Sequence, residues 1–249
     1  MSKERVAIIT GASSGIGAAT AIALAKDGFH VIAVARRADR LAKLAEQSNL
    51  IESFICDVTK QGDVDRLAAH CKDMAVEVLI HSAGGAFDAA TILDGDPDIW
   101  EKTYEINVIS TLRVTKAITP IMQSRGIGHI VIISSTAGHR AYENGGSYVA
   151  AKFAETSMAH TLRLELNGQP IRITEIAPGM VKTDEFAVNR YDGDRAKAAK
   201  VYEGVEKPLT AEDVAESIRW SVTLPEHFNV DSMVIRPVAQ AANHKVSRK

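Results

Sequence analysis

The feature that most constrains the fold is an alternation of short, continuously apolar runs with longer amphipathic segments. Runs that are apolar at every position are typical of a parallel sheet covered on both faces. The runs expected as strands are 5–10, 30–35, 51–56, 76–82, 128–134, 171–177 and 232–236. The segments expected as helices are 15–28, 38–48, 61–72, 98–124, 147–166 and 211–223. The pattern predicts an α/β fold, a doubly wound parallel sheet with helices on both faces and ligands at the carboxyl ends of its strands.

Length and composition indicate a single domain over residues 1–249, with 46% hydrophobic residues available for a core. No internal repeat or low-complexity linker interrupts the alternation. Residues 178–208 have weak periodicity and are expected to form a substrate loop or lid, since loops of that length are often functional. The polar stretch 239–249 is expected to be a C-terminal tail or a subunit contact.

Several classes of function are disfavoured. A net charge of −2 gives no electrostatic footprint for nucleic acid. Cys56 and Cys71 are too few for a disulfide framework, and their apolar surroundings favour small buried side chains. The sequence has neither a secretory leader pattern nor an apolar stretch of membrane-spanning length, so we expect a cytoplasmic protein without a membrane partner. No His, Cys or carboxylate cluster has metal-ligand spacing, and we expect no catalytic metal.

A glycine-rich turn joins the first strand to the first helix, which is the context required of a Rossmann-type dinucleotide site. Gly11 permits a tight turn, Gly15 lets the backbone approach a pyrophosphate, and Gly17 lets the helix pack closely on the sheet. The helix N-terminus then offers N–H donors to phosphate. The cofactor contacts expected in this turn are Gly11, Ser13, Ser14, Gly15, Ile16 and Gly17.

The end of the second strand indicates which dinucleotide is bound. NAD enzymes usually carry a carboxylate there for the ribose hydroxyls, but this chain has Ala35 followed by Arg36 and Arg37. Because a guanidinium fork suits a 2′-phosphate, the sequence favours NADP(H) over NAD(H). Asp57, after the third strand, is either an acceptor for the adenine amino group or a turn and helix-capping residue.

Three residues carry the candidate chemistry. Tyr148 and Lys152 share one face of a helix at i and i+4, and Ser135 lies thirteen residues before the tyrosine. A nearby ammonium favours the phenolate, so we expect Lys152 to lower the pKa of Tyr148. Such a tyrosine exchanges a proton with a substrate oxygen that the serine holds. Beside a nicotinamide, this set of residues suits carbonyl–alcohol redox chemistry.

Taken together, these motifs resemble the short-chain dehydrogenase/reductase family, from Thr10 to about Pro237. The resemblance depends on TGASSGIG at 10–17, Asp57-Val58, Ala83-Gly84, Asn107, Ser135, Tyr148-x-x-x-Lys152 and Pro178-Gly179. It implies a catalytic tetrad in which Asn107 holds a water, Ser135 polarises the carbonyl, Tyr148 is the acid/base and Lys152 binds the nicotinamide ribose. Asn107 could instead satisfy backbone groups, and Ser134 is the alternative to Ser135. Further implied cofactor contacts are Val58, Ser82, Ala83, Gly84, Asn107, Tyr148, Lys152, Pro178, Gly179, Val181 and Thr183.

One motif departs from the family pattern. Where the family usually has Asn-Asn-Ala-Gly, this chain has His81-Ser82-Ala83-Gly84. Ser82 offers fewer hydrogen bonds than asparagine, so side-chain bracing of the sheet is in doubt at that position. We interpret His81 as a buried, hydrogen-bonded histidine without a catalytic role.

The last third of the chain (166–186, 189–205 and 223–238) resembles the NADP-dependent serine / 3-hydroxy acid dehydrogenase branch. Members of that branch oxidise L-allo-threonine, serine and 3-hydroxy acids, or reduce the matching semialdehydes. An acidic substrate needs a cationic anchor, and we favour Arg190 in the lid over Arg140, although both could be solvent-exposed charges. The alternatives are a general carbonyl reductase and an NADP-binding regulatory protein without turnover. The resemblance also implies a homotetramer that pairs through the long helix and the tyrosine helix. The apolar faces of these helices, including Val149, Phe153 and Met158, could form such an interface or simply pack in the core.

Overall fold

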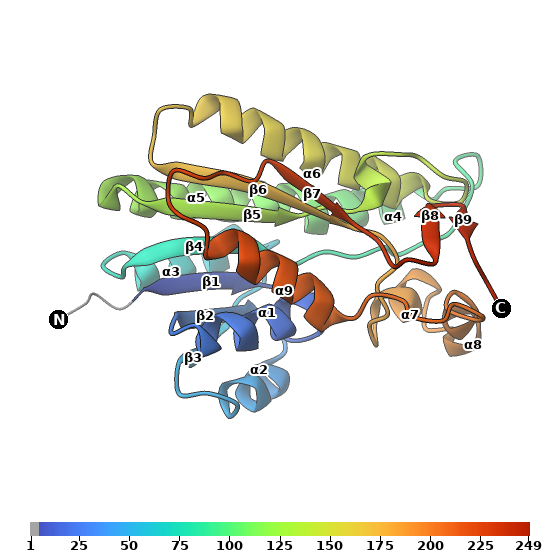
Figure 1. Cartoon of the computed structure of the whole chain (residues 1–249), viewed down its shortest axis with the longest axis horizontal. Coiled ribbons are helices and arrows are strands. Elements are labelled where there is room, and N and C mark those ends of the chain that lie inside the picture. The colour runs from blue at the N-terminus through green and yellow to red at the C-terminus, as the bar shows by residue number, and fades with distance from the viewer. Residues whose placement is uncertain (1–4) are drawn as a thin grey trace.

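The computed structural model describes residues 5–249, which form a seven-stranded parallel sheet with helices on both faces (Figure 1). Its order is β3-β2-β1-β4-β5-β6-β7, and every neighbouring pair is parallel. The strands are β1 (Val6–Thr10), β2 (His30–Ala35), β3 (Ile51–Ile55), β4 (Val76–His81), β5 (Gly128–Ile133), β6 (Ile171–Pro178) and β7 (Ser232–Ile235). The doubly wound fold and all seven expected strands are confirmed. Residues 1–4 of the expected domain lie outside the described residues.

Two helical layers bury the sheet. The longer helices are α1 (Gly15–Lys26), α2 (Ala38–Ala45), α3 (Gln61–Cys71), α4 (Pro97–Tyr104), α5 (Ser110–Arg125), α6 (Gly146–Glu165) and α9 (Ala211–Val222). Helices α1, α2 and α9 pack on one face around Leu24 and Phe29, and α3, α5 and α6 pack on the other around Ile118 and Met122. Central strands such as β1 and β5 are buried at every position because both faces of the sheet are covered there, whereas the edge strands β3 and β7 are partly exposed.

The helix expected over 98–124 is not regular. A π-helical turn, η1 (Glu105–Ile109), separates α4 from α5 and carries Asn107. The prediction of one uniform helix is therefore wrong over these five residues. A π turn widens a helix locally and often marks a functional site, and a hydrophobic periodicity does not reveal it.

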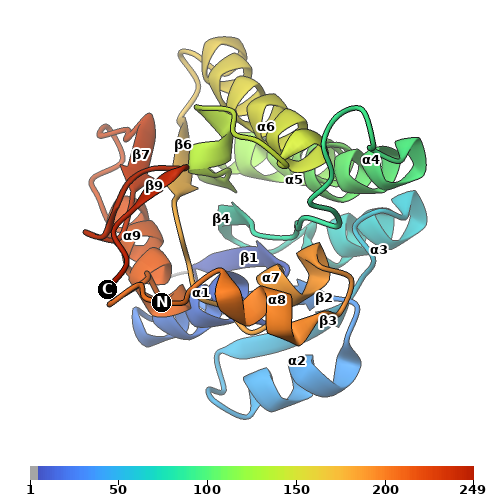
Figure 2. The ribbon, with the colours of Figure 1, turned by 90° about the vertical axis from the view of Figure 1, so that its right-hand side faces the viewer.

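The expected loop 178–208 contains two short helices, α7 (Phe186–Arg190) and α8 (Arg195–Lys200), so its description as an irregular loop is incomplete. Helices this short depend on tertiary contacts, and their apolar periodicity is too brief to recognise. The expected tail forms a hairpin of β8 (Gln240–Ala242) and β9 (Lys245–Val246). Beyond it, the Lys249 N–H donates to the Gly204 carbonyl at 2.9 Å. Figure 2 shows α7, α8 and this hairpin at the carboxyl ends of the strands.

The strand order reverses between β1 and β4, which is where ligands bind in open α/β sheets. Gly11 follows β1 and lies so close to β4 that a Cβ there would come within 2.6 Å of the Ser82 carbonyl oxygen. The Thr10 hydroxyl accepts from the Ser82 and Ala83 N–H groups at 3.1 and 3.2 Å. The Thr10 side chain on β1 therefore braces the backbone at the end of β4, the position where the sequence put bracing by the Ser82 side chain in doubt. Within 5–249, no helix combines the length and apolarity that a membrane span requires.

Candidate active site

A cavity of about 470 Å³ opens at the carboxyl ends of the strands. Most of the predicted site residues line it: Gly11, Ser13, Ser14, Gly15, Ile16, Arg36, Arg37, Asp57, Val58, Ser82, Ala83, Gly84, Ser135, Tyr148, Lys152, Pro178, Gly179, Val181, Thr183 and Arg190. Three predicted residues, Gly17, Asn107 and Arg140, are described by the structure but lie off the cavity wall. No cluster of metal-ligating side chains is present among residues 5–249.

The glycine-rich turn needs its glycines for different reasons. Gly11 and Gly15 have φ of 70° and 53°, in the left-handed region that glycine adopts without strain. Gly17 begins the packing of α1, and a Cβ there would fall 2.5 Å from the Gly11 carbonyl oxygen. The turn therefore brings the N-terminus of α1 close to β1 and leaves its N–H groups at the cavity.

Ser135 and Ser134 lie next to each other in sequence but have different partners. The Ser135 hydroxyl donates to the Pro178 carbonyl at 3.3 Å, accepts from the Ala137 N–H at 3.1 Å, and acts to lower the pKa of the neighbouring Tyr148 phenol. The Ser134 hydroxyl is buried and donates to the carboxylate of Glu175 on β6. Both serines line the cavity, but the Ser134 hydroxyl is engaged by Glu175, whereas Ser135 acts on the Tyr148 phenol.

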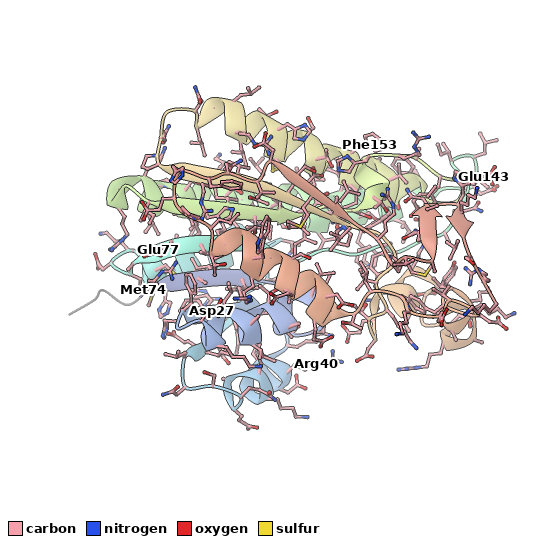
Figure 3. All side chains as sticks on the ribbon, viewed as in Figure 1. Asp27, Arg40, Met74, Glu77, Glu143 and Phe153 are labelled. Atoms are coloured by element: carbon pink, nitrogen blue, oxygen red, sulfur yellow. The ribbon has the colours of Figure 1, made fainter. Side chains whose placement is uncertain are left out.

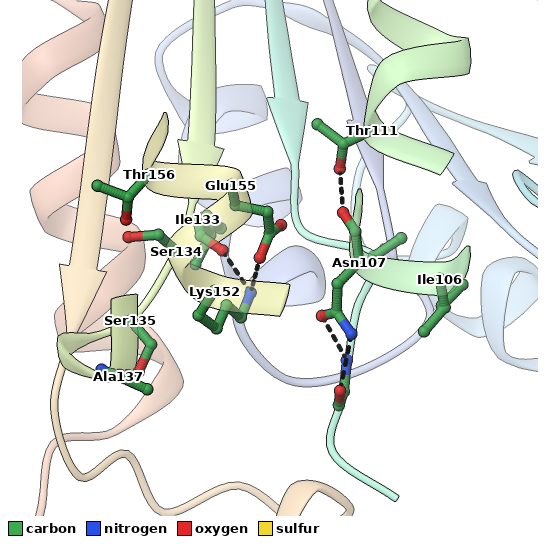
Figure 4. Close-up of polar contacts among 12 residues, drawn as sticks. Ile106, Asn107, Thr111, Ile133, Ser134, Ser135, Ala137, Lys152, Glu155 and Thr156 are labelled. Carbon is green, nitrogen blue, oxygen red and sulfur yellow. Dashed lines mark hydrogen bonds and ion pairs between the residues drawn. The ribbon is translucent and has the colours of Figure 1, made fainter. Parts of the chain in front are cut away.

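Lys152 is held by two groups (Figure 4). Its ammonium donates to the Ile133 carbonyl at 2.9 Å and pairs with Glu155 Oε2 at 2.6 Å. The same ammonium lies 5.6 Å from the centroid of the Tyr148 ring. Burial raises the pKa of the Glu155 carboxyl to about 7, although the Lys152 charge acts in the opposite direction. This arrangement fixes the lysine beside the tyrosine.

The expectation for the tyrosine pKa holds only in part. Burial raises the pKa of Tyr148 above its ordinary value, and the opposing effect of Lys152 does not cancel it. The expected net lowering is therefore wrong in this structure, because a buried phenolate loses its hydration and the lysine charge is shared with Glu155. Lys152 still favours the phenolate relative to a site without it.

Asn107, on the π turn, is buried behind the cavity wall. Its amide Nδ2 donates to the carbonyls of Gly85 and Thr103 at 2.9 and 2.7 Å, and its Oδ1 accepts from the Gly85 N–H at 3.1 Å. The side chain thus braces the segment after β4 through backbone groups, the alternative considered for it above. A Cβ at Gly84 would fall 2.5 Å from this Oδ1, so the glycine lets the segment approach the asparagine.

A cluster of donors lies at the other end of the cavity. Arg37 donates through Nε and Nη2 to the Ser13 hydroxyl and through Nη2 to the Ser14 hydroxyl, at 2.8–3.0 Å. Its Nη1 donates to both carboxylate oxygens of Glu185 at 2.6 and 2.8 Å. Arg40 pairs with the same carboxylate. The donors predicted to bind a phosphate therefore hold an anion from the chain itself.

Two other predicted residues have clear local roles. Asp57 Oδ1 accepts from the Thr59 N–H and hydroxyl at 3.1 and 2.8 Å, so Asp57 shapes the turn before α3 while it also lines the cavity. His81 is buried and its Nε2 pairs with the Thr115 hydroxyl at 2.9 Å. Burial lowers the pKa of this histidine to about 3, which matches a neutral structural residue.

The two candidate substrate anchors differ in position. Arg190 lines the cavity, donates to the Tyr142 hydroxyl at 3.1 Å and to the Asn144 carbonyl at 2.7 Å. Its Nε is buried and has no hydrogen-bond partner within residues 5–249. Arg140 is exposed and does not line the cavity. The structure thus brings only the first of the two arginines to the site.

Sequence reasoning missed Glu155, Glu185 and Phe186. The Phe186 ring packs edge-on against Tyr148, with centroids 5.4 Å apart and an angle of 66°. Glu155 was recognisable in principle, since it lies three residues after Lys152 on the buried face of α6. Glu185 and Phe186 lie at the start of α7, which had no sequence signal.

The sheet, the glycine turn and the Ser135–Tyr148–Lys152 group together form the arrangement expected from the sequence for a dinucleotide-dependent oxidoreductase. Comparison with known proteins gives the family: a model described as short chain dehydrogenase matches residues 5–192. This chain belongs to the short-chain dehydrogenase/reductase family.

Individual relatives cover nearly the whole chain. An uncharacterized oxidoreductase of Mycobacterium tuberculosis is 47% identical over 240 residues, which are 96% of this chain and 94% of the relative. The NADP-dependent 3-hydroxy acid dehydrogenase of Salmonella typhi is 34% identical over 242 residues, 95% of this chain and 96% of the relative. Among solved structures, the closed form of serine dehydrogenase complexed with NADP+ matches with a TM-score of 0.91 at 32% identity, over 98% of this chain and 100% of the other.

Proposed function

We propose that the protein catalyses reversible hydride transfer between NADP(H) and the 3-hydroxyl carbon of a small 3-hydroxy acid such as serine, L-allo-threonine or 3-hydroxypropionate. The observation that carries this proposal is the convergence of Ser135, Tyr148 and Lys152 on a cavity that Arg190 also lines. The similarity to a 3-hydroxy acid dehydrogenase and to serine dehydrogenase supports the substrate class.

The residues present fit NADP(H). The glycine turn leaves room for a pyrophosphate at the N-terminus of α1, and Gly84 keeps the wall beside Lys152 open. Arg37 with Ser13 and Ser14 already holds a carboxylate, and the same donors suit the 2′-phosphate. Lys152 would hold the nicotinamide ribose. When bound, the cofactor supplies the hydride acceptor for oxidation or the hydride donor for reduction.

The chain's own residues handle the substrate oxygen and its proton. In oxidation, the Tyr148 phenolate accepts the hydroxyl proton while the carbon gives up its hydride, so the alcohol loses two electrons and becomes a carbonyl. In reduction, the Tyr148 phenol returns this proton to the carbonyl oxygen. The Ser135 hydroxyl orients that oxygen, and the Lys152 ammonium stabilises the phenolate.

Arg190 would bind the substrate carboxylate. Its buried Nε has no partner within 5–249, and buried polar groups in proteins are almost always hydrogen-bonded. A carboxylate accepts from the guanidinium fork in a bidentate manner, which would satisfy this donor. The acid group would then fix which hydroxyl faces Tyr148.

The proposal includes a homotetramer and a cytoplasmic location. Large apolar side chains remain exposed on the helices that we expect to pair subunits: Tyr104 is 44% exposed, Leu112 42% and Phe153 44%. Figure 3 labels Phe153 on the outer side of α6. Burying such side chains against a second copy would remove apolar surface from water. Sedimentation of the purified protein tests the oligomeric state directly.

The test of the activity is initial NADP+ reduction at alkaline pH with L-allo-threonine, serine and 3-hydroxypropionate, each repeated with NAD+. We expect turnover of the acids with NADP+ and weak turnover with NAD+. Turnover only of bulky apolar carbonyls would support the general carbonyl reductase instead. A Tyr148→Phe variant that binds NADPH but loses turnover separates an enzyme from a regulatory NADP-binding protein, since only an enzyme needs the phenol.

A further inference from the structure

We propose that Glu185 is a built-in competitor for the 2′-phosphate of the cofactor and that its displacement moves Phe186 at the catalytic tyrosine. The inference depends on the NADP(H) preference proposed above and adds a residue that sets it. Glu185 would lower the affinity for the phosphorylated cofactor and link the adenosine end of the cavity to Tyr148.

The contacts of the Glu185 carboxylate support the first part of the proposal, its competition with the 2′-phosphate. Arg37 Nη1 contacts both oxygens of Glu185, the Ser14 hydroxyl donates to Oε2 at 3.0 Å, and Arg40 pairs with Oε1. Ser13 binds the other side of the same guanidinium. Two arginines and a hydroxyl around one anion are the donor set that a phosphate monoester also requires. Glu185 thus occupies the place of the ligand group.

The charge of Glu185 makes the competition direct. Burial alone would raise the pKa of this carboxyl, but the hydrogen bonds from Arg37, Arg40 and Ser14 outweigh it and lower the pKa to about 2. The group is therefore an anion throughout the pH range of the reaction. A doubly charged phosphate and this carboxylate repel each other at hydrogen-bond distance from one guanidinium, so binding of one disfavours the other.

The Glu185 carboxylate can be displaced because it and its two arginine partners are only partly buried. The side chains of Arg37, Arg40 and Glu185 are 38%, 43% and 26% exposed. Ion pairs in such positions are screened by water and contribute modestly, so a carboxylate can leave without unfolding of the segment. Glu185 lies between the end of β6 and α7, outside the main sheet.

Phe186 connects the displacement of Glu185 to the end of the cavity where Tyr148 lies. It follows Glu185 directly and packs edge-on against the Tyr148 ring. The Glu185 carbonyl also accepts from the Asn189 N–H at 2.8 Å, which closes the first turn of α7. A shift of Glu185 therefore pulls on both the ring that covers Tyr148 and the start of the helix that ends at Arg190.

Binding of the adenosine half tests the competition without any turnover. We expect Glu185→Gln to lower the dissociation constant of 2′,5′-ADP about tenfold in calorimetric titrations, since an amide neither repels the phosphate nor forms a charged pair with Arg37. The affinity for 5′-AMP should stay unchanged. Asp184→Asn is the matched control: Asp184 lines the same cavity and carries the same charge, but it has no ion pair with either arginine within 5–249. We expect it to change 2′,5′-ADP affinity less than about twofold.

Hydrogen exchange tests the movement. We expect the amides of 186–190 to exchange faster when 2′,5′-ADP binds to the wild type and to remain unaffected by 5′-AMP. In Glu185→Gln these amides should already exchange fast without ligand. Slower exchange of this segment with 2′,5′-ADP would mean that Glu185 closes over the phosphate, and would overturn the proposal.

The outcomes separate this inference from the proposed function. A wild type that binds 5′-AMP as tightly as 2′,5′-ADP would contradict the NADP(H) preference itself. A wild type that prefers 2′,5′-ADP, with equal or weaker binding by Glu185→Gln, would contradict only the competition. An equal gain in Asp184→Asn would also contradict it, because the effect would then be general electrostatics.

Discussion

The ammonium of Lys152 lies 2.6 Å from a carboxylate oxygen of Glu155, and both side chains are almost fully buried, with 7% and 1% exposed. Burial is the largest single influence and would lower the pKa of Lys152, but the charge and hydrogen bond of Glu155, together with Tyr148 and Glu175, outweigh it and the pKa is raised. The pair thus keeps the lysine cationic beside Tyr148. Burying a carboxylate costs stability, and strongly shifted groups of this kind cluster at functional sites.

This pair predicts a pH-dependent difference in stability. The pKa of Glu155 is raised from 4.5 to about 7 in the folded protein, so the folded state holds a proton that the unfolded state releases. The stabilisation that comes from this more tightly held proton on Glu155 is fully present below pH 4.5 and is lost as the pH rises through about 7. We therefore expect the wild type to lose stability relative to Glu155→Gln between pH 5 and pH 8, measured by urea unfolding. Glu165→Gln, at an exposed site on the same helix, should show no such trend; a constant difference for Glu155→Gln would contradict the assignment.

The raised pKa of Tyr148 predicts opposite pH profiles for the two directions of the reaction. Burial disfavours the phenolate, and oxidation needs the phenolate as proton acceptor. We expect the kcat/KM of oxidation to rise about tenfold per pH unit from neutral into alkaline pH, since each unit increases the phenolate fraction tenfold below the pKa. Reduction needs the phenol and should decline only at alkaline pH. If kcat/KM for oxidation levelled off near pH 7, the Lys152 charge would lower the pKa of Tyr148 by more than burial raises it, which would contradict this prediction.

The position of Arg190 predicts a selective loss of substrate affinity. Replacing the anchor with alanine removes a charged hydrogen bond to the acid, and we expect KM for a 3-hydroxy acid to rise about 10- to 100-fold with a smaller change in kcat. Arg140→Ala is the control, because Arg140 lies off the cavity wall. Initial-rate kinetics with the acid and with a neutral alcohol of similar size measure the effect. Equal KM values for both arginine variants and the wild type would remove the anchor from the mechanism.

Much of the fold could be predicted because its signals are local. The buried strands carry continuous apolar runs, VAII within Val6–Thr10 and IVII within Gly128–Ile133, and glycines punctuate the first turn. The π turn at Glu105–Ile109 had no such signal, since a single widened turn leaves the periodicity of a helix almost unchanged. The short helices α7 and α8 exist through contacts with distant segments, which no local pattern records.

The site residues likewise fall into those that a local sequence pattern identifies and those that only the folded chain brings together. Residues with a characteristic neighbour or spacing, such as Tyr148 and Lys152, were identifiable before the fold was known. Glu185 meets Arg37 across 148 residues of sequence, and only the folded chain brings them together. The pKa of Tyr148 depends on its burial and on Glu155 as well as on Lys152. An expectation based on the lysine and the tyrosine alone therefore predicted a lowered pKa where the pKa is raised.

The close contact of α1 with the glycine turn predicts a large cost for one added methyl group. In Gly17→Ala the new Cβ would fall 2.5 Å from the Gly11 carbonyl oxygen, and a backbone atom at a tight turn has little room to move. We expect the free energy of unfolding to fall by about 3 kcal/mol, at the upper end of the usual cost of overpacking, and 2′,5′-ADP to bind more weakly because the N-terminus of α1 is pushed away.

Gly62→Ala is the matched control, since Gly62 also lies in the first turn of a helix and a Cβ there meets nothing within 4 Å. It should leave stability unchanged or raise it by up to about 1 kcal/mol, because alanine loses less backbone entropy than glycine on folding. Urea unfolding of both variants measures the contrast. If Gly17→Ala were as stable as Gly62→Ala, the turn would have to relax at little cost, and the close approach of helix and strand would not be what demands glycine at position 17.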